Sequence, residues 1–330
     1  WWDEAERLIG AIDIPVHTGA GWYGYTYKTH LSGAQNYFAL LRGTKRLTLM
    51  GPAHPDRPLR ALRRQMLEWF DHWLMGTQTG LEAEPAVRYW LMGANSWRTA
   101  SDWPLPQTRW TKLYLNSWER LSADPYIAGS NDDFVPPDSF VQMPPTHTNR
   151  VAGLRYLTDP LGEDVEIAGP ISLTLYAAID QDDTNWIVIL KDVGPDESLR
   201  TAREGEREIS PDLQERELTR GWLKASHRAI DPGRSRPGRP WHPLTREAQC
   251  KVVPGKIVAY EIEILATANL FRKGHRICIE ITSLDLPTGV SGMTNVEYIP
   301  YHIGSSRTTL HHIHHDAAHP SHLLLPVIPH

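Results

Sequence analysis

The order of secondary structure in the first 76 residues restricts the fold more than any other feature of this chain. Two apolar segments of strand length, 14–20 and 45–51, are each followed by a stretch with apolar residues at helical spacing, 31–43 and 59–76. Strands that alternate with helices in this way predict two parallel strands with crossover helices. Because two strands cannot form an independent domain, we expect that more of this sheet precedes Trp1.

The apolar residues of the two predicted helices define the faces that should be buried. They are Leu31, Ala34, Phe38 and Leu41 in the first helix, and Leu59, Leu62, Met66, Phe70, Trp73 and Leu74 in the second. Gly76 follows the second helix and is predicted to end it.

From residue 77 onward the periodicity changes to that of strands. Alternating or continuous apolar runs recur, among them 84–93, 111–116, 171–179, 185–193, 257–265 and 275–287. Long loops rich in Pro and Gly separate these runs, and the charged stretch 197–220 is expected to be an exposed insertion. The predicted fold class is therefore α/β plus all-β, with an α/β part over 1–76 and an antiparallel β-sandwich over 77–330.

Composition and charge exclude several classes of protein. The chain has 330 residues, 41% of them hydrophobic and 22% charged, and its net charge of −5 argues against a nucleic-acid partner. No apolar run approaches the roughly 20 residues of a membrane span and no signal-peptide pattern is present, so no membrane partner is expected and a cytoplasmic location is favoured. Two cysteines, Cys250 and Cys278, exclude a disulfide framework. The oligomeric state is left open.

A histidine on the loop after the second predicted strand is the first candidate for chemistry. His54 lies at the edge of a parallel sheet where ligands bind, and an imidazole with a pKa near ~6.5 suits a general base; a surface histidine without a role is the alternative. The loop 19–30, one strand earlier, is where an acid that orients such a histidine is expected. It contains four aromatic residues, including Trp22 and Tyr23, but no carboxylate. For these aromatic residues packing is favoured over substrate contact.

No nucleophile can be identified in the sequence. The motif G-x-S-x-G does not occur, and the nearest match, TGVSGM at 288–293, has Met293 in the last place. No P-loop, dinucleotide fingerprint, EF-hand loop or H-E-x-x-H motif occurs either, so no cofactor is expected.

The segment 310–322 (LHHIHHDAAHPSH) contains six histidines and raises the question of a metal. Adjacent histidines in a strand, such as His311 and His312, point to opposite faces, whereas a metal needs ligands that converge on one point. Three of them could converge only with help from a loop. We therefore expect histidines at an edge or turn, and no metal site.

Several segments resemble one family both in sequence and in order. The stretches 51–58 (GPAHPDRP) and 66–106 (beginning MLEWFDHWLMG) strongly resemble the CocE/NonD hydrolases, which are relatives of cocaine esterase and of Xaa-Pro dipeptidyl-peptidase. Later stretches resemble the C-terminal domain of the same family; these are 166–193, 218–243, 260–287 and 319–329. The resemblance covers essentially the whole chain.

The resemblance implies the C-terminal end of an α/β-hydrolase domain over 1–76 and a jelly-roll, galactose-binding-like β-sandwich over 77–330. It implies a serine esterase or peptidase that cleaves ester or amide bonds of a small-molecule or peptide substrate through an acyl-enzyme, with no cofactor. His54 matches the family's histidine, the general base, and Trp22 and Tyr23 would line the acyl pocket. The serine would lie upstream of the region that matches this chain, so the chain alone is expected to be inactive.

Gly24 occupies the position of the family's catalytic acid, after the motif G-W-Y. Three explanations are open. The acid comes from elsewhere, with Asp56 as the nearest alternative; or a backbone carbonyl or water orients His54 at a lower rate; or the protein is a non-catalytic relative. We rank a relocated acid first and loss of activity second. A β-sandwich module that binds carbohydrate or mediates assembly is the alternative function.

Overall fold

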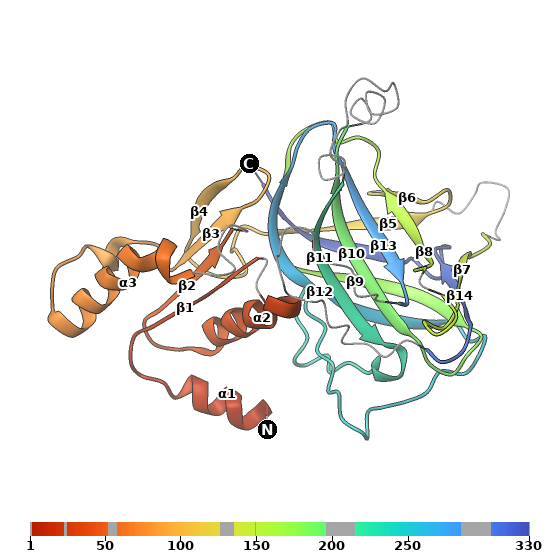
Figure 1. Cartoon of the computed structure of the whole chain (residues 1–330), viewed down its shortest axis with the longest axis horizontal. Coiled ribbons are helices and arrows are strands. Elements are labelled where there is room, and N and C mark those ends of the chain that lie inside the picture. Colours follow the sequence, from red (N-terminus) through yellow and green to blue (C-terminus); the bar gives the residue numbers. More distant parts are fainter. Residues whose placement is uncertain are drawn as a thin grey trace. The chain divides into compact units, whose positions relative to one another are not determined.

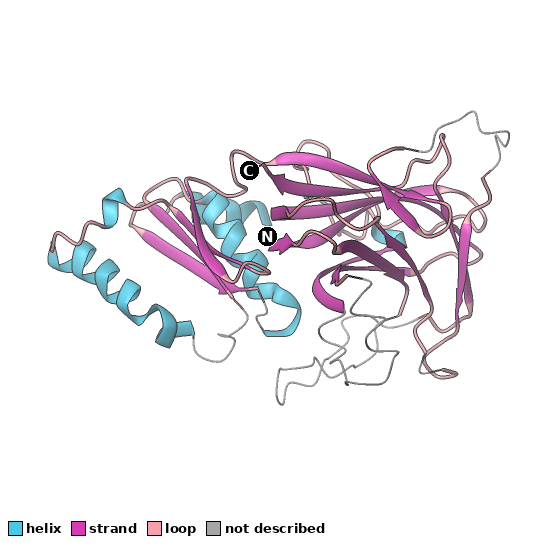
Figure 2. Ribbon diagram, turned by 90° about the horizontal axis from the view of Figure 1, so that it is seen from above, coloured by secondary structure: helices cyan, strands magenta, loops and turns pink. Residues whose placement is uncertain are grey.

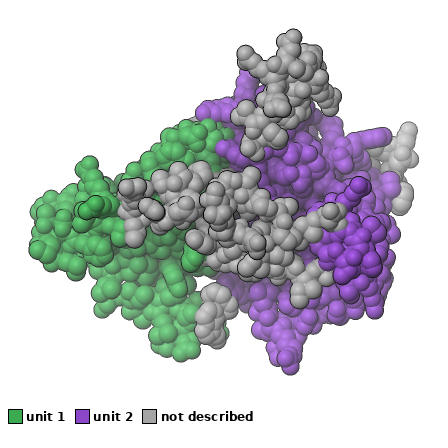
Figure 3. All heavy atoms as spheres, viewed as in Figure 1, with its two compact units in different colours: residues 1–108, 268–270 green, residues 109–267, 271–330 purple. Residues whose placement is uncertain are grey.

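The computed structural model describes residues 2–22, 25–51, 58–125, 135–148, 150–195, 215–284 and 305–329. The chain forms two compact units, which Figure 3 shows in different colours. Unit 1 consists of residues 1–108 and 268–270, and unit 2 consists of residues 109–267 and 271–330. Each unit has a sheet of its own.

Unit 1 is built on a four-stranded sheet in the order β1-β2-β3-β4. Its strands are β1 (Val16–Gly21), β2 (Lys45–Met50), β3 (Val87–Leu91) and β4 (Ser96–Ala100), and its helices are α1 (Trp2–Gly10), α2 (Tyr25–Leu40), α3 (Pro58–Met75) and the short η1 (Leu81–Ala83). Strands β1, β2 and β3 run parallel, and β4 is antiparallel to β3. In Figure 2, α2 and α3 lie on opposite sides of this sheet. Helices on both faces of a mainly parallel sheet give the α/β architecture that the alternation predicts.

The first helix has the predicted face but an earlier start. Leu31, Ala34, Phe38 and Leu41 are all buried, which confirms the apolar stripe. The predicted loop over 19–30 is wrong in its extent, because β1 continues to Gly21 and α2 already begins at Tyr25. Glycine permits this longer strand, since a Cβ atom at Gly19 would lie 2.5 Å from the carbonyl oxygen of Thr48 on β2.

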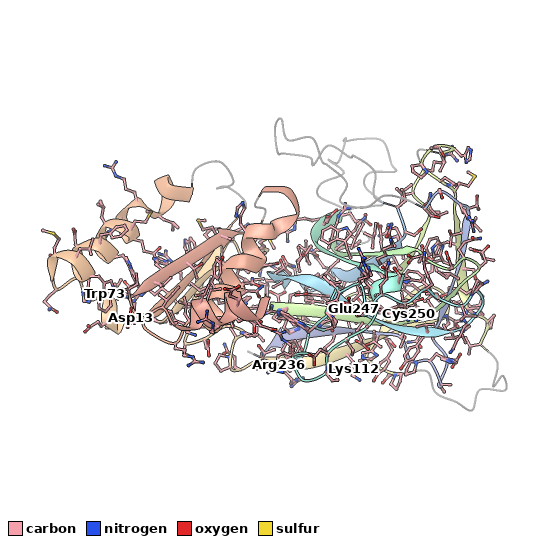
Figure 4. The ribbon with its side chains drawn as sticks, turned by 90° about the horizontal axis from the view of Figure 1, so that it is seen from below. Asp13, Trp73, Lys112, Arg236, Glu247 and Cys250 are labelled. Atoms are coloured by element: carbon pink, nitrogen blue, oxygen red, sulfur yellow. The ribbon has the colours of Figure 1, made fainter. Side chains whose placement is uncertain are left out.

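The buried face of α3 differs from the predicted stripe. Trp69 is buried, whereas Phe70 and Leu74, which the stripe includes, are 49% and 74% exposed. The ring of Trp69 packs against His17 of β1 at 5.3 Å and against Trp73, labelled in Figure 4, at 6.0 Å. Contact with β1 therefore sets the rotation of the helix. Hydrophobic spacing alone places Phe70 on the buried face, whereas the buried residue is Trp69, one position earlier. Gly76 follows the helix with a φ of 67°, as expected of a residue that ends it.

The α/β sheet extends beyond the predicted boundary at residue 76. The segment 84–93 is expected to belong to the β-rich part, but β3 pairs in parallel with β2, and unit 1 ends at Thr108. Residues 268–270 also belong to unit 1, where the backbone N–H of Met92 donates to the carbonyl oxygen of Ala268 at 3.1 Å. Strand propensity in a segment does not specify which sheet accepts it, and this explains the difference.

Unit 2 is almost entirely β-structure, as Figure 1 shows. Its strands are β5 (Arg109–Asn116), β6 (Arg120–Ser122), β7 (Asp138–Gln142), β8 (Gly153–Leu157), β9 (Val165–Ile179), β10 (Asn185–Val193), β11 (Glu215–Lys224), β12 (Val258–Phe271), β13 (Arg276–Thr282), β14 (Thr309–His314) and β15 (His322–Ile328), and η2 (Ala225–His227) is a short 3₁₀ helix. They form one sheet in the order β12-β11-β10-β13-β8-β6-β5-β15-β9-β14-β7. Because β12 also pairs with β9, this sheet is barrel-like.

The interior of unit 2 follows the predicted alternation closely. Ile277, Ile279 and Ile281 of β13 are buried, and β12 alternates between buried and partly exposed residues as far as Ala266, after which its residues are all buried. Cys278 is buried in the same strand, and burial raises the pKa of its thiol to about 11, so it is a small core residue. Of the charged stretch 197–220, residues 215–220 belong to β11, and the rest lies outside the described residues.

None of the helices in the described part of the chain combines the length and the apolar character that a membrane span requires.

Candidate functional site

The carboxyl ends of β1 and β2 lie side by side in unit 1. Gly21 is in register with Met50, and the backbone N–H of Trp22 donates to the carbonyl oxygen of Met50 at 2.9 Å. The two segments that follow these strands therefore begin next to each other. In open α/β sheets this edge is where ligands bind, which makes it the candidate functional site.

Trp22 fixes the start of the segment that follows β1. Its side chain is fully buried, and its indole Nε1 donates to the carbonyl oxygen of Trp90 on β3 at 2.6 Å. Its ring lies 6.1 Å from that of Trp103, which in turn lies 6.1 Å from the ring of Tyr89. Trp22 thus belongs to an aromatic cluster inside unit 1. That it also lines an acyl pocket stays a prediction.

Gly51 fixes the start of the segment that follows β2. A Cβ atom at this position would lie 2.6 Å from Cδ1 and 2.8 Å from Nε1 of Trp90, closer than any side chain can approach. The ring of Trp90 is held in turn by an edge contact with Trp97 of β4, at 5.4 Å and 83°. Only glycine lets the chain pass Trp90 along this path. Trp90 therefore contacts both residues at which the two segments begin, Trp22 and Gly51.

The other predicted site residues follow these two fixed positions within a few residues. Tyr23 and Gly24 follow Trp22, and His54 and Asp56 follow Gly51; all four lie outside the described residues. Ser291, in the rejected motif TGVSGM, also lies outside them. His30, by contrast, is an exposed residue of α2. The structure therefore brings together the strand ends that carry the predicted residues, and the roles of those residues stay predictions.

His17 is a titratable residue of this sheet that sequence reasoning missed. Its Nε2 lies 2.9 Å from Oγ1 of Thr48, and its ring packs on Trp69. Burial, together with the positive charge of Arg46, lowers the pKa of His17 to about 4, so the imidazole is neutral near pH 7. It lies near the amino end of β1, away from the candidate edge. The signal available in the sequence was its place within an otherwise small and apolar strand, which pointed to a histidine that is at least partly buried.

Arg46 ties β2 to the segment that precedes β3. Its guanidinium pairs with Glu84 at 2.5 Å and donates to the carbonyl oxygens of Leu81 and Glu84. The Arg46 side chain is 9% exposed, so its charge is largely shielded from water. Three acceptors around one buried guanidinium make this a structural contact.

The histidine-rich segment lies in β14, the turn after it and the first residue of β15, and its buried members have structural partners. His311 is fully buried and stacks on Phe140 with ring centroids 4.3 Å apart, and its Nε2 lies 2.8 Å from Oγ1 of Thr184. His315 is also buried, with Nε2 3.1 Å from Oδ2 of Asp138. Within the described residues, the group that could hold a metal ion is His314, Asp316 and His319.

Comparison with known proteins places the chain in a family. Residues 79–324 match the family model of the X-Pro dipeptidyl-peptidase C-terminal non-catalytic domain. The cocaine esterase of a Rhodococcus species is 27% identical, over 98% of this chain and 58% of that protein. The chain spans about half the length of the first curated relatives it matches, 46% of a mycobacterial relative and 58% of the cocaine esterase.

Solved structures agree with this match at the level of the fold. The crystal structure of a CocE/NonD family hydrolase from Staphylococcus aureus has a TM-score of 0.75 at 21% identity, covering 97% of this chain and 55% of the other. An aminopeptidase from a marine sediment archaeon (Thaumarchaeota) has a TM-score of 0.72 at 18% identity, covering 98% and 57%. These identities are low, so the structural likeness carries the fold and the family model carries the assignment. The chain belongs to the family of the X-Pro dipeptidyl-peptidase C-terminal domain, and it matches the C-terminal portion of the CocE/NonD hydrolases.

Proposed function

We propose that this chain supplies the histidine-bearing part of a serine hydrolase active site, which cleaves ester or amide bonds through an acyl-enzyme. The observation that carries the proposal is the register of β1 and β2, which starts the segments holding residue 24 and His54 side by side. In the resemblance to CocE/NonD hydrolases, these two segments are the ones that carry the acid and the base. The hydrolase relatives support this class of reaction.

In this proposal His54 accepts a proton and then donates it, once in each half of the reaction. As general base it accepts the proton of the serine hydroxyl while the serine oxygen attacks the acyl carbon, and as general acid it then gives that proton to the leaving group. Water then attacks the acyl-enzyme, His54 accepts its proton and returns it to the serine oxygen, and the acid product is released. Backbone N–H groups near the serine would bind the oxyanion. Because no G-x-S-x-G motif occurs in the 330 residues, the serine is placed on a segment outside them, and this chain alone is expected to be inactive.

Because residue 24 is a glycine, another group has to orient His54 in this proposal. A relocated acid is the first explanation, with Asp56 the nearest carboxylate in sequence and weak as a partner because neighbours on one loop rarely align well. A hydrogen bond from His54 to a backbone carbonyl or a water would support slower turnover. In this reading Trp22 and Tyr23 line the acyl pocket.

The remaining parts of the proposal concern the β-rich part and the setting of the enzyme. We assign the β-rich part to the jelly-roll, galactose-binding-like type, and the substrate to small esters, amides or peptides. No cofactor is needed for this chemistry. A cytoplasmic location is proposed as well.

A non-catalytic relative is the second candidate, and glycine at the position where the resemblance places the acid favours it. In this case the β-rich part would bind carbohydrate or mediate assembly. A carbohydrate array discriminates the two candidates, since micromolar binding of a sugar by the chain would favour the second.

The test uses the full-length protein that contains these residues, with a fluorophosphonate probe and p-nitrophenyl esters. We expect labelling and turnover by the full-length protein, and neither by the isolated 330 residues. His54→Ala should lower kcat/KM by about 10⁴-fold or more, while His30→Ala, at an exposed histidine on α2, should leave it unchanged. Turnover by the isolated chain would contradict the placement of the serine, and full activity of the His54→Ala variant would contradict the role of the histidine.

A further inference from the structure

A group of side chains with metal-ligand chemistry lies in unit 2, far along the chain from His54. One donor atom each of His314, Asp316 and His319 lies within 4.8 Å of the other two. His314 is the last residue of β14, and the other two belong to the turn that connects β14 with β15. All three side chains are partly exposed, so ions in solution can reach them.

The chain brings these residues together in two ways. β14 alternates between buried and partly exposed residues, so His314 lies on its outer face. The Asp316 carboxylate accepts the backbone N–H groups of Ala318 at 2.8 Å and of His319 at 2.9 Å, which folds the turn. The ring of His319 then lies 5.6 Å from that of His314. This is the loop contribution that the strand pattern of 310–322 does not reveal.

Neighbouring strands hold the group in place. The ring of His319 makes an edge contact with Tyr176 of β9 at 5.6 Å. The hydroxyl of Ser321 donates to the carbonyl oxygen of His314 at 2.6 Å and accepts the backbone N–H of Tyr176 at 2.9 Å. The residues on either side of the turn are thus fixed to the sheet, and little order has to be gained when a ligand binds.

We propose that His314, Asp316 and His319 form a binding site for a divalent transition-metal ion, with zinc as the best match. Two imidazole nitrogens and one carboxylate oxygen are donors that zinc prefers. A tetrahedral zinc ion with bonds of about 2.0–2.2 Å holds its ligand atoms roughly 3.3 Å apart. Nδ1 of His319 is already 3.0 Å from both carboxylate oxygens of Asp316, so these two ligands need only a small adjustment.

Metal binding replaces a hydrogen bond that the group makes by itself. Without an ion, Nδ1–H of His319 donates to the Asp316 carboxylate; when Nδ1 binds the ion, the imidazole proton moves to Nε2. Among the described residues the group has three protein ligands, which leaves the fourth position to water. The ion ties the end of β14 to the turn before β15, and this role is independent of the proposed hydrolase chemistry.

The experiment measures zinc binding by the chain, purified without a histidine tag and treated with EDTA, using isothermal titration calorimetry with ZnCl₂. We expect one site per chain that is clearly tighter than any other. His319→Gln and Asp316→Asn should each weaken it by about 100-fold or more. Asparagine keeps the side-chain oxygen that accepts the turn N–H groups, so Asp316→Asn should still fold, as circular dichroism in EDTA will verify.

His312→Gln is the matched control, because His312 lies on the same face of β14 but hydrogen-bonds to Ser139 instead of joining the group. It should bind zinc as the native chain does. Cobalt(II) gives a second readout: tetrahedral d–d absorption bands in the native chain and in His312→Gln, lost in His319→Gln, support the site. Native chain that binds no zinc, or variants at His319 and Asp316 that bind it with native affinity, would overturn the proposal.

Discussion

Acid should destabilise unit 2 through one buried histidine, His311. Its side chain has no exposed surface, stacks on Phe140 and makes an edge contact with Trp186 at 5.2 Å. Burial lowers the pKa of His311 to about 4 from the ordinary value near 6.5, although backbone hydrogen bonds and the negative charge of Asp180 oppose the shift. The perturbation is a change of pH from 7.5 to 5, applied to the native chain and to His311→Gln.

The sign follows from which state binds the proton. Between pH 6.5 and pH 4 the unfolded chain protonates this histidine and the native state does not, so the free energy of unfolding falls as the pH falls. Above about pH 6.5 both states are neutral and the contribution is fully present. At pH 5 the two pKa values give a loss of about 2 kcal/mol at this one site.

The assay is urea unfolding in EDTA at both pH values, followed by tryptophan fluorescence. Glutamine does not titrate, and its amide can replace the contact of Nε2 with the Thr184 hydroxyl. The native chain should lose about 2 kcal/mol more than His311→Gln between pH 7.5 and pH 5, because the other titrating groups cancel in the difference. His312→Gln, a change on the opposite face of β14, should lose as much as the native chain. An equal loss in the native chain and His311→Gln would refute the reasoning.

Two further predictions concern unit 1. Gly51→Ala places a Cβ atom 2.6 Å from the Trp90 ring and should destabilise the chain by about 1–3 kcal/mol in thermal unfolding, whereas Gly33→Ala in α2, where a Cβ atom meets nothing within 4 Å, should be neutral or slightly stabilising; equal effects of the two changes would contradict the packing argument. Arg46→Met removes a positive charge near His17 and should raise the pKa of His17 in an NMR titration, yet leave it below 6.5 because burial is the larger cause; an unchanged pKa would show that Arg46 does not act on His17.

Local periodicity in the sequence was sufficient for most elements. Tyr260, Ile262 and Ile264 alternate with two glutamates along β12, and all three are fully buried. A period of two residues encodes which face of a strand is buried, so the strands of unit 2 could be predicted without knowing their partners. The same holds for the buried stripe of α2.

The sequence pattern did not show which segments pack or pair with each other. The segment 84–93 was correctly expected to be a strand, but its parallel pairing with β2 was not predicted, because this pairing joins residues about forty positions apart. The rotation of α3 depends on the contact of Trp69 with His17, which no helical pattern contains. The candidate metal group was missed for a related reason, since a turn rather than a strand brings Asp316 and His319 to His314.

In the candidate active site, too, the sequence predicted the positions of the loops but not the contacts with residues far along the chain. The spacing of strand and loop pointed to His54 and to the loop 19–30, and the resemblance to the CocE/NonD hydrolases pointed to position 24. The groups that fix the start of each loop come from β3, in the form of the carbonyl oxygen and the ring of Trp90. Among the described residues, Trp22 and Gly51 are held by contacts with Trp90. We therefore expect a change at position 24 to leave the start of the loop as it is. For this reason Gly24→Asp in the full-length protein tests chemistry more than folding. A gain in fluorophosphonate labelling with unchanged thermal stability would mean that the acid was lost, and unchanged labelling of an active enzyme would mean that it lies elsewhere.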